Sequence, residues 1–450
     1  MAHLIPFNGV LYNGEILQKD IARVVAPPYD VIDATFQQAL HARHPHNVIR
    51  LELGLDQPGD APGHNKYSRA AATLRQWMAE GVLTRDSKPA IYPYAIDYAV
   101  PSGGLGSGTR VLKGFISTIK LEEFGTGKIY PHENTRAAAK SDRLNLMEAC
   151  AANFSCIFSL FSDPDGAVLG TVGQTMTAAP RIDFTDDVGC RQRLWTITDE
   201  VTLAKLTAAM ASKPLFIADG HHRYETALNY RRLRRQAAGG SGQGLQPYDA
   251  VMMLFSSLDD PGLTVLPTHR VLRHRVPALA GIRQQLADRF VFEDFRADQR
   301  RQFIRTMRTN GQASPVFGLA SRGADTYVLL TLKPEHRPPA TASERDRLDV
   351  SILEKEIIDR LCPTQADHEA ILYTKDDDEA LDLIGQDKGE AALLLNPTKV
   401  EQVRAVAAAG GRMPHKSTYF YPKPLTGLVM NVMGEGKRQE AGHRQLGPPR

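Results

Sequence analysis

The stretch Phe216-Ile-Ala-Asp-Gly-His-His-Arg-Tyr-Glu-Thr-Ala227 carries the clearest indication of local fold in this chain. An apolar run typical of a buried strand covers residues 213–218, and a pattern with helical spacing follows over residues 224–237. Asp219 and Gly220 stand between the two, and glycine permits a tight reversal and a close approach of the backbone to a ligand. The sequence therefore predicts a strand that runs into a helix, with a polar junction between them.

The same junction holds side chains that suit phosphate chemistry. A helix N-terminus offers unpaired N–H groups and the positive end of the helix dipole, which favour a bound phosphate. His221, His222 and Arg223 add donors for phosphate oxygens, and Asp219 can orient a histidine or hold a divalent cation. We predict nucleotide phosphate binding at residues 220–223, with Asp219 and His222 as catalytic residues and Asp219 as a metal ligand.

Two other interpretations of the junction stay open. In the first, Asp219 only caps the helix and the histidines are ordinary surface residues. In the second, His221, His222 and Glu225 hold a metal ion, although adjacent histidines on a helix point in different directions.

Strands and helices alternate along the whole chain, which predicts an α/β protein with mixed sheets. The glycine-rich stretch 101–109 joins strand to strand, so we expect a hairpin tip there rather than a phosphate loop. Further strands are predicted at 48–53, 90–100, 110–121, 156–161, 193–198, 250–255, 263–266 and 417–421, and further helices at 67–79, 136–152, 201–210 and 349–361. Four regions are expected: an α/β region over 1–160, a region over 161–275 that contains the polar junction, a second α/β region over 276–434, and a disordered tail over 435–450.

A second polar constellation is Tyr130-Pro-His-Glu-Asn-Thr135, which is followed by Lys140, Asp142 and Arg143. Lys140 and Arg143 share a helix face, because residues three apart are neighbours on a helix. We predict that both bind an anion, that Glu133 is a catalytic carboxylate, and that His132 and Thr135 contact the substrate. The alternative is a capping loop followed by a salt-bridged helix.

Three weaker candidates lie elsewhere in the chain. The prolines of Val25-Ala-Pro-Pro-Tyr-Asp30 stiffen a segment that presents Asp30 as a possible catalytic carboxylate, although such a segment can also serve packing alone. His269 and Arg270 follow a predicted strand and are candidates for substrate binding. Lys416 and Lys423 offer further cations near the end of the chain.

Composition narrows the class of protein. The 450 residues carry 54 Lys+Arg and 51 Asp+Glu, which gives a net charge of +3, without the basic excess typical of nucleic-acid binders. The one dense basic run is Arg231-Arg232-Leu233-Arg234-Arg235, and we expect it to be a solvated helix face. No segment reaches the ~18 apolar residues of a membrane helix, no secretory signal is visible, and the 4 cysteines lack metal spacing, so we expect a cytoplasmic protein with buried thiols. Motifs of P-loop kinases, zincins, α/β-hydrolases and Rossmann dehydrogenases are absent.

Four segments together resemble the domain-of-unknown-function 1015 family over nearly the full length: 26–30, 131–135, 218–227 and 267–270. The segment 217–227 is also similar to the nucleotide-phosphate motif of the ParB/sulfiredoxin superfamily, which includes the free serine kinases. That second resemblance implies a ParB/sulfiredoxin-like core and phosphate binding by Gly220, His221, His222 and Arg223, with Asp219 near the metal or the transferred group. The kinases' catalytic glutamate has no clear counterpart here, and the candidates are Glu133, Glu52 and Asp30.

The leading hypothesis is a nucleotide-dependent phosphotransferase that uses ATP or ADP with Mg²⁺ and phosphorylates a small hydroxyl substrate, with free L-serine as the first candidate. One rival is a ParB-like nucleotide-binding module that acts through DNA or protein association. The other is a metal-dependent phosphoester hydrolase. A homo-oligomeric state stays open. Because Asp219 and Arg223 lie at an element junction, their removal is expected to abolish turnover while changing stability by less than about 1 kcal/mol.

Overall fold

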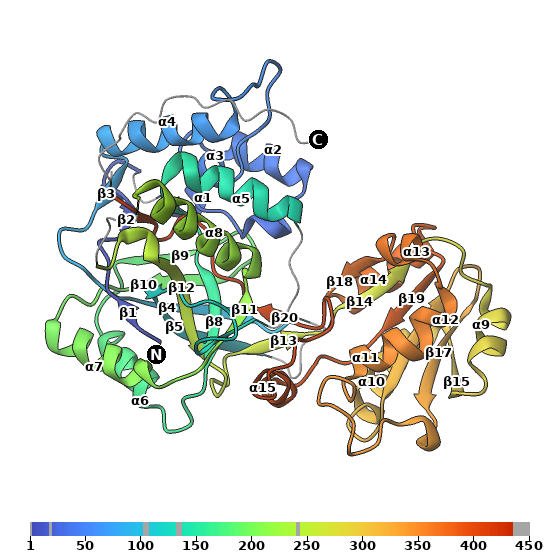
Figure 1. Cartoon of the computed structure of the whole chain (residues 1–450). Helices are drawn as coiled ribbons and strands as arrows, with labels where there is room; N and C mark the ends of the chain where they lie inside the picture. Colours follow the sequence, from blue (N-terminus) through green and yellow to red (C-terminus); the bar gives the residue numbers. More distant parts are fainter. Residues whose placement is uncertain (1, 18–19, 102–107, 132–136, 240–243, 435–450) are drawn as a thin grey trace.

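The computed structural model describes residues 2–17, 20–101, 108–131, 137–239 and 244–434, so the expected disordered tail lies outside the described residues. Two large sheets organise the chain, and in Figure 1 the second lies to the right of the first with its helices in yellow to orange. The combination of mixed sheets and helices confirms the predicted α/β fold class.

The first sheet contains nine strands and is mixed. Strand β11 pairs parallel with β6 and antiparallel with β8, and β8 in turn pairs parallel with β12. The remaining contacts are antiparallel, with β1 added at one end of β5. In spatial order the strands are β6 (Ile129–Tyr130), β11 (Leu215–Asp219), β8 (Ile157–Phe161), β12 (Ala250–Ser257), β5 (Thr109–Lys120), β4 (Tyr92–Ala99), β10 (Arg191–Leu194) and β9 (Ile182–Thr185), with β1 at Leu4–Ile5.

Both faces of this sheet are covered, because side chains alternate along each strand. On β11, Leu215 and Ile217 join one apolar cluster, whereas Phe216 and Ala218 join the other. Helices α4, α5 and α8 pack in that order, α4 on α5 and α5 on α8 (Figure 1). The helices around this sheet are α1 (Ile21–Val24), α2 (Ala34–Arg43), α3 (Ile49–Glu52), α4 (Lys66–Ala79), α5 (Ala137–Cys150), α6 (Ala167–Thr175), α7 (Glu200–Ala211) and α8 (His221–Ala237).

The second sheet has six strands, and all of its pairings are antiparallel. In spatial order they are β15 (Phe290–Arg296), β17 (Thr326–Leu332), β16 (Val316–Ser321), β19 (Ala391–Leu394), β14 (His269–Leu272) and β18 (Leu372–Thr374). The helices of this half are α9 (Leu279–Leu286), α10 (Arg300–Asn310), α11 (Asp349–Leu353), a π-helix (Glu354–Ile358), α12 (Asp359–Leu361), α13 (Gln365–Glu369) and α14 (Asp377–Gly385). Helix α15 (Val400–Ala408), dark red in Figure 1, lies between the two sheets.

Small strand pairs bring the end of the chain back to its beginning. Strand β20 (Tyr419–Tyr421) pairs with β13 (Thr264–Leu266), and this pair lies between the two large sheets in Figure 1. Further along, β21 (Asn431–Val432) pairs with β7 (Ala152–Asn153). The remaining pair joins β2 (Val10–Tyr12) to β3 (Leu83–Arg85). Residues 431–432 therefore lie beside residues 152–153, from the first half of the sequence.

Most predicted elements exist, but one has the wrong type. The expected strand at 48–53 is the short helix α3, because Asn47 Oδ1 accepts the Ile49 N–H at 2.9 Å and Val48 O accepts from both Leu51 and Glu52. These local bonds override the β preference of Val48 and Ile49. Helix α8 begins at His221, three residues earlier than expected, and the expected strand at 193–198 is shifted to β10. The tip of the β4–β5 hairpin at 102–107 lies outside the described residues.

Two of the expected region boundaries, near residues 160 and 275, can be compared with the two sheets. The nine-stranded sheet takes strands from both sides of residue 160, so that boundary does not separate two sheets. The boundary near residue 275 comes just after β14, the first strand of the second sheet in the sequence. All four cysteines are buried and unpaired, and no helix among the described residues is long and apolar enough to cross a membrane.

Candidate functional site

A cleft of about 510 Å³ opens where β11 ends and α8 begins. Its walls come from both halves of the chain, with the junction on one side and the segments around β18 and β20 on the other. The residues that line it are Tyr29, Asp30, Val31, Ala218, Asp219, Gly220, His221, His222, Arg223, Thr268, Tyr373, Thr374, Lys375, Glu379, His415, Lys416, Thr418, Tyr419, Phe420 and Lys423. The predicted phosphate junction therefore faces a cavity of ligand size.

Gly220 makes the turn between strand and helix possible. Its φ of +95° lies in the left-handed region, which side-chain-bearing residues rarely adopt. A Cβ at this position would lie 2.9 Å from Nε and Nη2 of Arg223. The first intrahelical bond of α8 runs from Tyr224 N to Gly220 O at 3.1 Å, so the preceding N–H groups are the ones that a helix start offers to a ligand.

Asp219 is held between two cations. Its Oδ2 accepts from Arg223 Nη2 at 2.7 Å, and its Oδ1 lies 2.7 Å from Lys423 Nζ. Arg223 is itself buried, and its Nη1 donates to the carbonyl of Cys156 at 2.5 Å. The guanidinium is thus engaged with the protein, which makes Arg223 a positioning residue for Asp219 rather than a side chain extended toward solvent.

These ion pairs determine the charge states in the cleft. Burial by itself raises the pKa of Asp219, but the charges of Lys423 and Arg223 outweigh it and hold that pKa below its ordinary value. Burial by itself lowers the pKa of Lys423, but the carboxylates of Asp219 and Asp30 outweigh it and raise that pKa. Both groups are therefore ionised at neutral pH.

Lys423 also ties the N-terminal segment to the junction. Its Nζ lies 2.7 Å from Asp30 Oδ2, so one ammonium bridges two carboxylates that are far apart in sequence. Asp30 lies in a short 3₁₀ turn, Tyr29–Val31, that follows the two prolines, and its side chain keeps 37% of its surface exposed. The structure thus places the predicted Asp30 in the same cleft as the junction.

The opposite wall adds cations that the junction lacks. Lys375 Nζ lies 4.6 Å from the centroid of the Tyr419 ring, and both residues line the cleft together with Lys416. Behind them, Arg270 is fully buried, and its Nη2 donates to the carbonyls of His415 and Lys416 at 3.4 and 3.2 Å. Arg270 therefore acts through this wall, not through contact with a ligand.

The predicted histidines have different positions. His221 and His222 both line the cleft, His221 buried and His222 half-buried. His269 is fully buried outside the lining, where Nε2 lies 3.0 Å from Asp377 Oδ1 and Nδ1 accepts from Leu395 N at 3.3 Å. Burial lowers the pKa of His269 despite the carboxylate beside it. The expected substrate contact by His269 therefore does not fit its position.

The second constellation is only partly described. His132, Glu133 and Thr135 lie outside the described residues, so their expected roles stay predictions. Lys140, which was expected to bind an anion, instead has its Nζ 2.8 Å from Glu225 Oε2 and is absent from the cleft lining.

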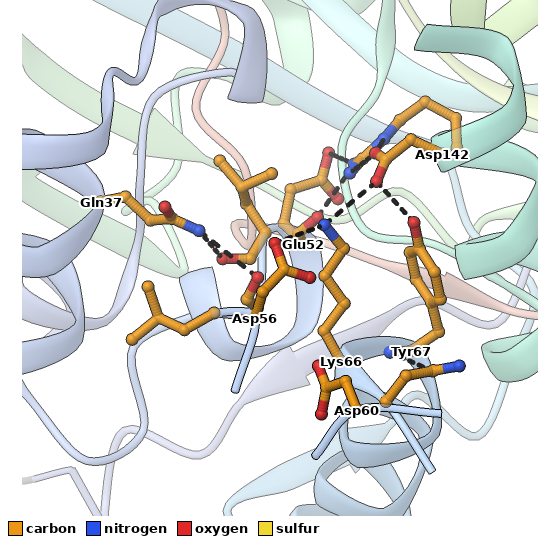
Figure 2. Close-up of polar contacts among 12 residues, drawn as sticks. Gln37, Glu52, Asp56, Asp60, Lys66, Tyr67 and Asp142 are labelled. Atoms are coloured by element: carbon orange, nitrogen blue, oxygen red, sulfur yellow. Dashed lines mark hydrogen bonds and ion pairs between the residues drawn. The ribbon is translucent and has the colours of Figure 1, made fainter. Parts of the chain in front are cut away.

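Arg143 belongs to a buried ion-pair cluster behind the cleft. Its Nη1 donates to the Glu52 carbonyl at 2.9 Å and lies 3.3 Å from Glu52 Oε1, and its Nη2 lies 2.5 Å from Asp142 Oδ2. Asp142 in turn accepts from the Tyr67 hydroxyl and lies near Lys66 (Figure 2). Arg143 therefore does not lie where the expected anion site would need it. Its buried guanidinium is instead paired with the carboxylates of Glu52 and Asp142.

The same cluster contains Glu52, another candidate carboxylate, and contacts one residue of the cleft lining. Glu52 is buried and accepts from Ser155 Oγ at 2.9 Å, so it is engaged away from the cavity. Arg143 also lies 4.3 Å from the centre of the Tyr29 ring, and burial raises the pKa of Tyr29 to about 12. Since Tyr29 lines the cleft next to Asp30, the cluster supports the segment that carries Asp30.

The basic run of α8 is partly paired with acidic neighbours. Arg231 and Arg232 lie 2.7 and 2.6 Å from the two oxygens of Glu123, and Arg235 lies 2.8 Å from Asp249. The expected face is thus partly paired instead of wholly solvated. Within the described ranges, the group with metal-ligand spacing is Glu354, Asp359 and His368, which does not include the histidines of the junction.

Two cations of the cleft were difficult to find from sequence. Lys375 stands alone between a short strand and a helix, with no motif around it. Lys423 was only a weak candidate, and its flanking prolines are the one local signal that it occupies a fixed position.

Replacing Gly220 with alanine should lower the free energy of unfolding by about 2–3 kcal/mol, because the left-handed φ is strained and the new Cβ would displace the anchored Arg223 guanidinium. Gly108 is a matched control, since its φ is +96° and a Cβ there would meet nothing within 4 Å. Gly108→Ala should cost about 1 kcal/mol. If urea unfolding showed the same loss of stability for Gly220→Ala and Gly108→Ala, the Arg223 guanidinium would be able to move aside without a cost in free energy.

Among solved structures, a conserved hypothetical protein from Pyrococcus furiosus is 13% identical with a TM-score of 0.31, covering 68% of this chain and 92% of that chain. A free serine kinase mutant in complex with AMP is 11% identical with a TM-score of 0.35, covering 75% and 95%. SbnI with a C-terminal truncation, from Staphylococcus aureus, is 10% identical with a TM-score of 0.34, covering 69% and 85%.

No match was found among curated proteins. One family matches residues 4–351, a span that includes the N-terminal Asp30 segment, the junction at 219–223 and the segment around Thr268. The resemblance expected from the sequence motifs is thereby confirmed. The chain belongs to the family described as "Protein of unknown function (DUF1015)".

Proposed function

We propose that this protein is a nucleotide-dependent phosphotransferase that phosphorylates a small hydroxyl substrate, with free L-serine as the first acceptor to test. One observation carries the proposal: a helix start, three lysines and three carboxylates converge on a single cleft of about 510 Å³. Phosphoryl transfer needs mainly positioning and neutralisation of charge, and these groups supply both.

The phosphates would lie at the start of α8. Its first N–H groups and His222 are the donors on that side, and Lys416 and Lys375 face them from the opposite wall. Arg223 is not a phosphate ligand in this proposal, because its two terminal nitrogens already contact Asp219 and the carbonyl of Cys156. It would act by fixing Asp219, and through it Lys423.

Asp30 is the carboxylate best suited to accept the proton of the acceptor hydroxyl. Asp219 is held by two cations with a lowered pKa, which makes it a weak base. Asp30 is paired with Lys423, and its side chain is 37% exposed at the cleft. Glu133 is the remaining candidate from the sequence.

The residues present do not fit a resident Mg²⁺ ion on Asp219. Magnesium takes oxygen ligands in octahedral geometry, whereas both oxygens of Asp219 already contact cationic nitrogens at 2.7 Å. The Lys423 ammonium lies where an ion bridging Asp219 and Asp30 would have to lie. A Mg²⁺ ion that enters with ATP or ADP is part of the donor substrate, and no step is assigned to it.

Neither rival hypothesis gains support from the site. A DNA-binding module needs cations directed at a backbone, but Arg231, Arg232 and Arg235 are paired with carboxylates. A zinc-type hydrolase at the junction would use Glu225, which is paired with Lys140.

The test combines a thermal-shift screen of nucleotides with an acceptor panel of amino acids and sugars. We expect ATP or ADP to raise the melting temperature, and phosphate to be transferred to one hydroxyl acceptor. Turnover of phosphomonoesters without nucleotide would favour the hydrolase instead. Salt-sensitive retention on DNA, without nucleotide turnover, would favour the binding module.

A further inference from the structure

A second cavity of about 300 Å³ adjoins the charged cleft. The two share the residues Val31, Lys375, Tyr419 and Lys423, so one ligand can extend from one cavity into the other. Lys375 and Lys423 stand at this shared boundary, with their ammonium groups 4.6 and 5.1 Å from the centroid of the Tyr419 ring.

The second cavity differs from the first in chemical character. Apolar side chains from the 22–36 segment and from residues 419–425 make up most of its lining, including Pro28, Phe36 and Leu425. Two of its lining residues, Val31 and Val188, are exposed apolar side chains, with 39% and 78% of their surface accessible. Apolar surface left in contact with water around a cavity is the surface that a bound apolar group would cover.

The polar lining of this cavity includes two neighbouring carboxylates, Asp186 and Asp187, which suit the edge of a flat ring. Asp186 accepts from Gln192 Nε2 at 2.8 Å and from Cys190 N at 2.9 Å, which fixes the carboxylate in place. Asp187 lies beside it, pairs with Arg43, and keeps 59% of its side chain exposed. Carboxylates of this kind can accept hydrogen bonds from an exocyclic amino group.

We infer that the second cavity binds the nucleobase of the nucleotide whose phosphates occupy the charged cleft. The inference rests on the proposed function and names the part of the ligand that each cavity takes. A nucleoside diphosphate has one flat, weakly polar end and one polyanionic end, as this pair of cavities has. A small acceptor such as serine has no apolar part that would need the second cavity.

The experiment compares two probes by calorimetry: ADP, and inorganic pyrophosphate, which has the phosphates without the nucleoside. The unmodified protein should bind ADP at least about tenfold more tightly than pyrophosphate. Val188→Asp and Val31→Asp should each weaken ADP binding by about tenfold or more, because a carboxylate beside a bound base is costly to desolvate. Pyrophosphate affinity should stay unchanged in Val188→Asp, whose residue lines the second cavity alone, whereas Val31→Asp should lower it as well, because Val31 also lines the charged cleft.

Val201→Asp is the matched control, since Val201 on α7 is 77% exposed and lines neither cavity. It should leave both affinities unchanged. The base site would be overturned, and the phosphate site left intact, by either of two results. One is equal affinities of the unmodified protein for ADP and pyrophosphate, and the other is an ADP affinity that is unchanged in both Val188→Asp and Val31→Asp. Failure of the unmodified protein to bind either probe would overturn the proposed function itself.

Discussion

Replacing Lys423 with methionine should abolish phosphoryl transfer and lower the free energy of unfolding by about 3 kcal/mol. The side chain is 10% exposed and bridges Asp219 and Asp30 at 2.7 Å each. Its removal leaves two neighbouring carboxylates without their common cation, which is costly in a poorly solvated site. Urea unfolding measures the stability change, and coupled nucleotide turnover at saturating acceptor measures the activity.

Lys416→Met is the control for that variant, because Lys416 is an exposed lysine in the lining of the same cleft. It should weaken nucleotide binding and change stability by no more than about 0.5 kcal/mol. Full activity in Lys423→Met would mean that the bridging ammonium has no part in transfer. An unchanged unfolding curve would mean that the two carboxylates are better solvated than their burial indicates.

Asp219→Asn and Arg223→Met should each destabilise the protein by about 3 kcal/mol, and the double variant by clearly less than the sum. The reason is that each single change leaves the other buried charge without its partner at 2.7 Å. This result would replace the expectation, drawn from sequence, of a change below about 1 kcal/mol. A double-mutant cycle in urea measures the coupling, and strict additivity would contradict a direct pair.

The same variants predict a dependence of stability on pH. Because the pKa of Asp219 lies below its unfolded value, its ionisation stabilises the fold above pH ~4, and this contribution disappears as the pH falls further. The unmodified protein should therefore lose stability below pH ~4 more steeply than Asp219→Asn. Parallel stability curves for the two would show that Asp219 is not ionised more readily in the folded state.

The position of the cleft explains why neither half of the chain suffices for the proposed reaction. Asp219 and His222 come from the first sheet and the helix that follows it, whereas Lys375 and Tyr373 lie at the edge of the second sheet. Strand β20, paired with β13, brings Lys423 across to the junction. A relative movement of the two halves would change the distance between the cations of one wall and the helix start of the other.

The sequence by itself determined the local architecture of the junction. The apolar run ending at Asp219, the glycine and the helical periodicity after Tyr224 are short-range patterns, and the structure has β11, a left-handed Gly220 and α8 in those places. The sequence also supplied the rigid segment that presents Asp30, because prolines restrict the backbone wherever they stand.

Only the tertiary structure decided which charges face the cavity. Arg143, Lys140 and Arg223 looked like phosphate ligands in sequence. Arg143 and Lys140 instead pair with carboxylates outside the cleft lining, and Arg223 lines the cleft but is paired with Asp219. Lys423 and Lys375, which carried little or no signal, face the cleft. The physical reason is that a charge withdrawn from water must find its partner across the fold, and such a partner leaves no trace in local periodicity.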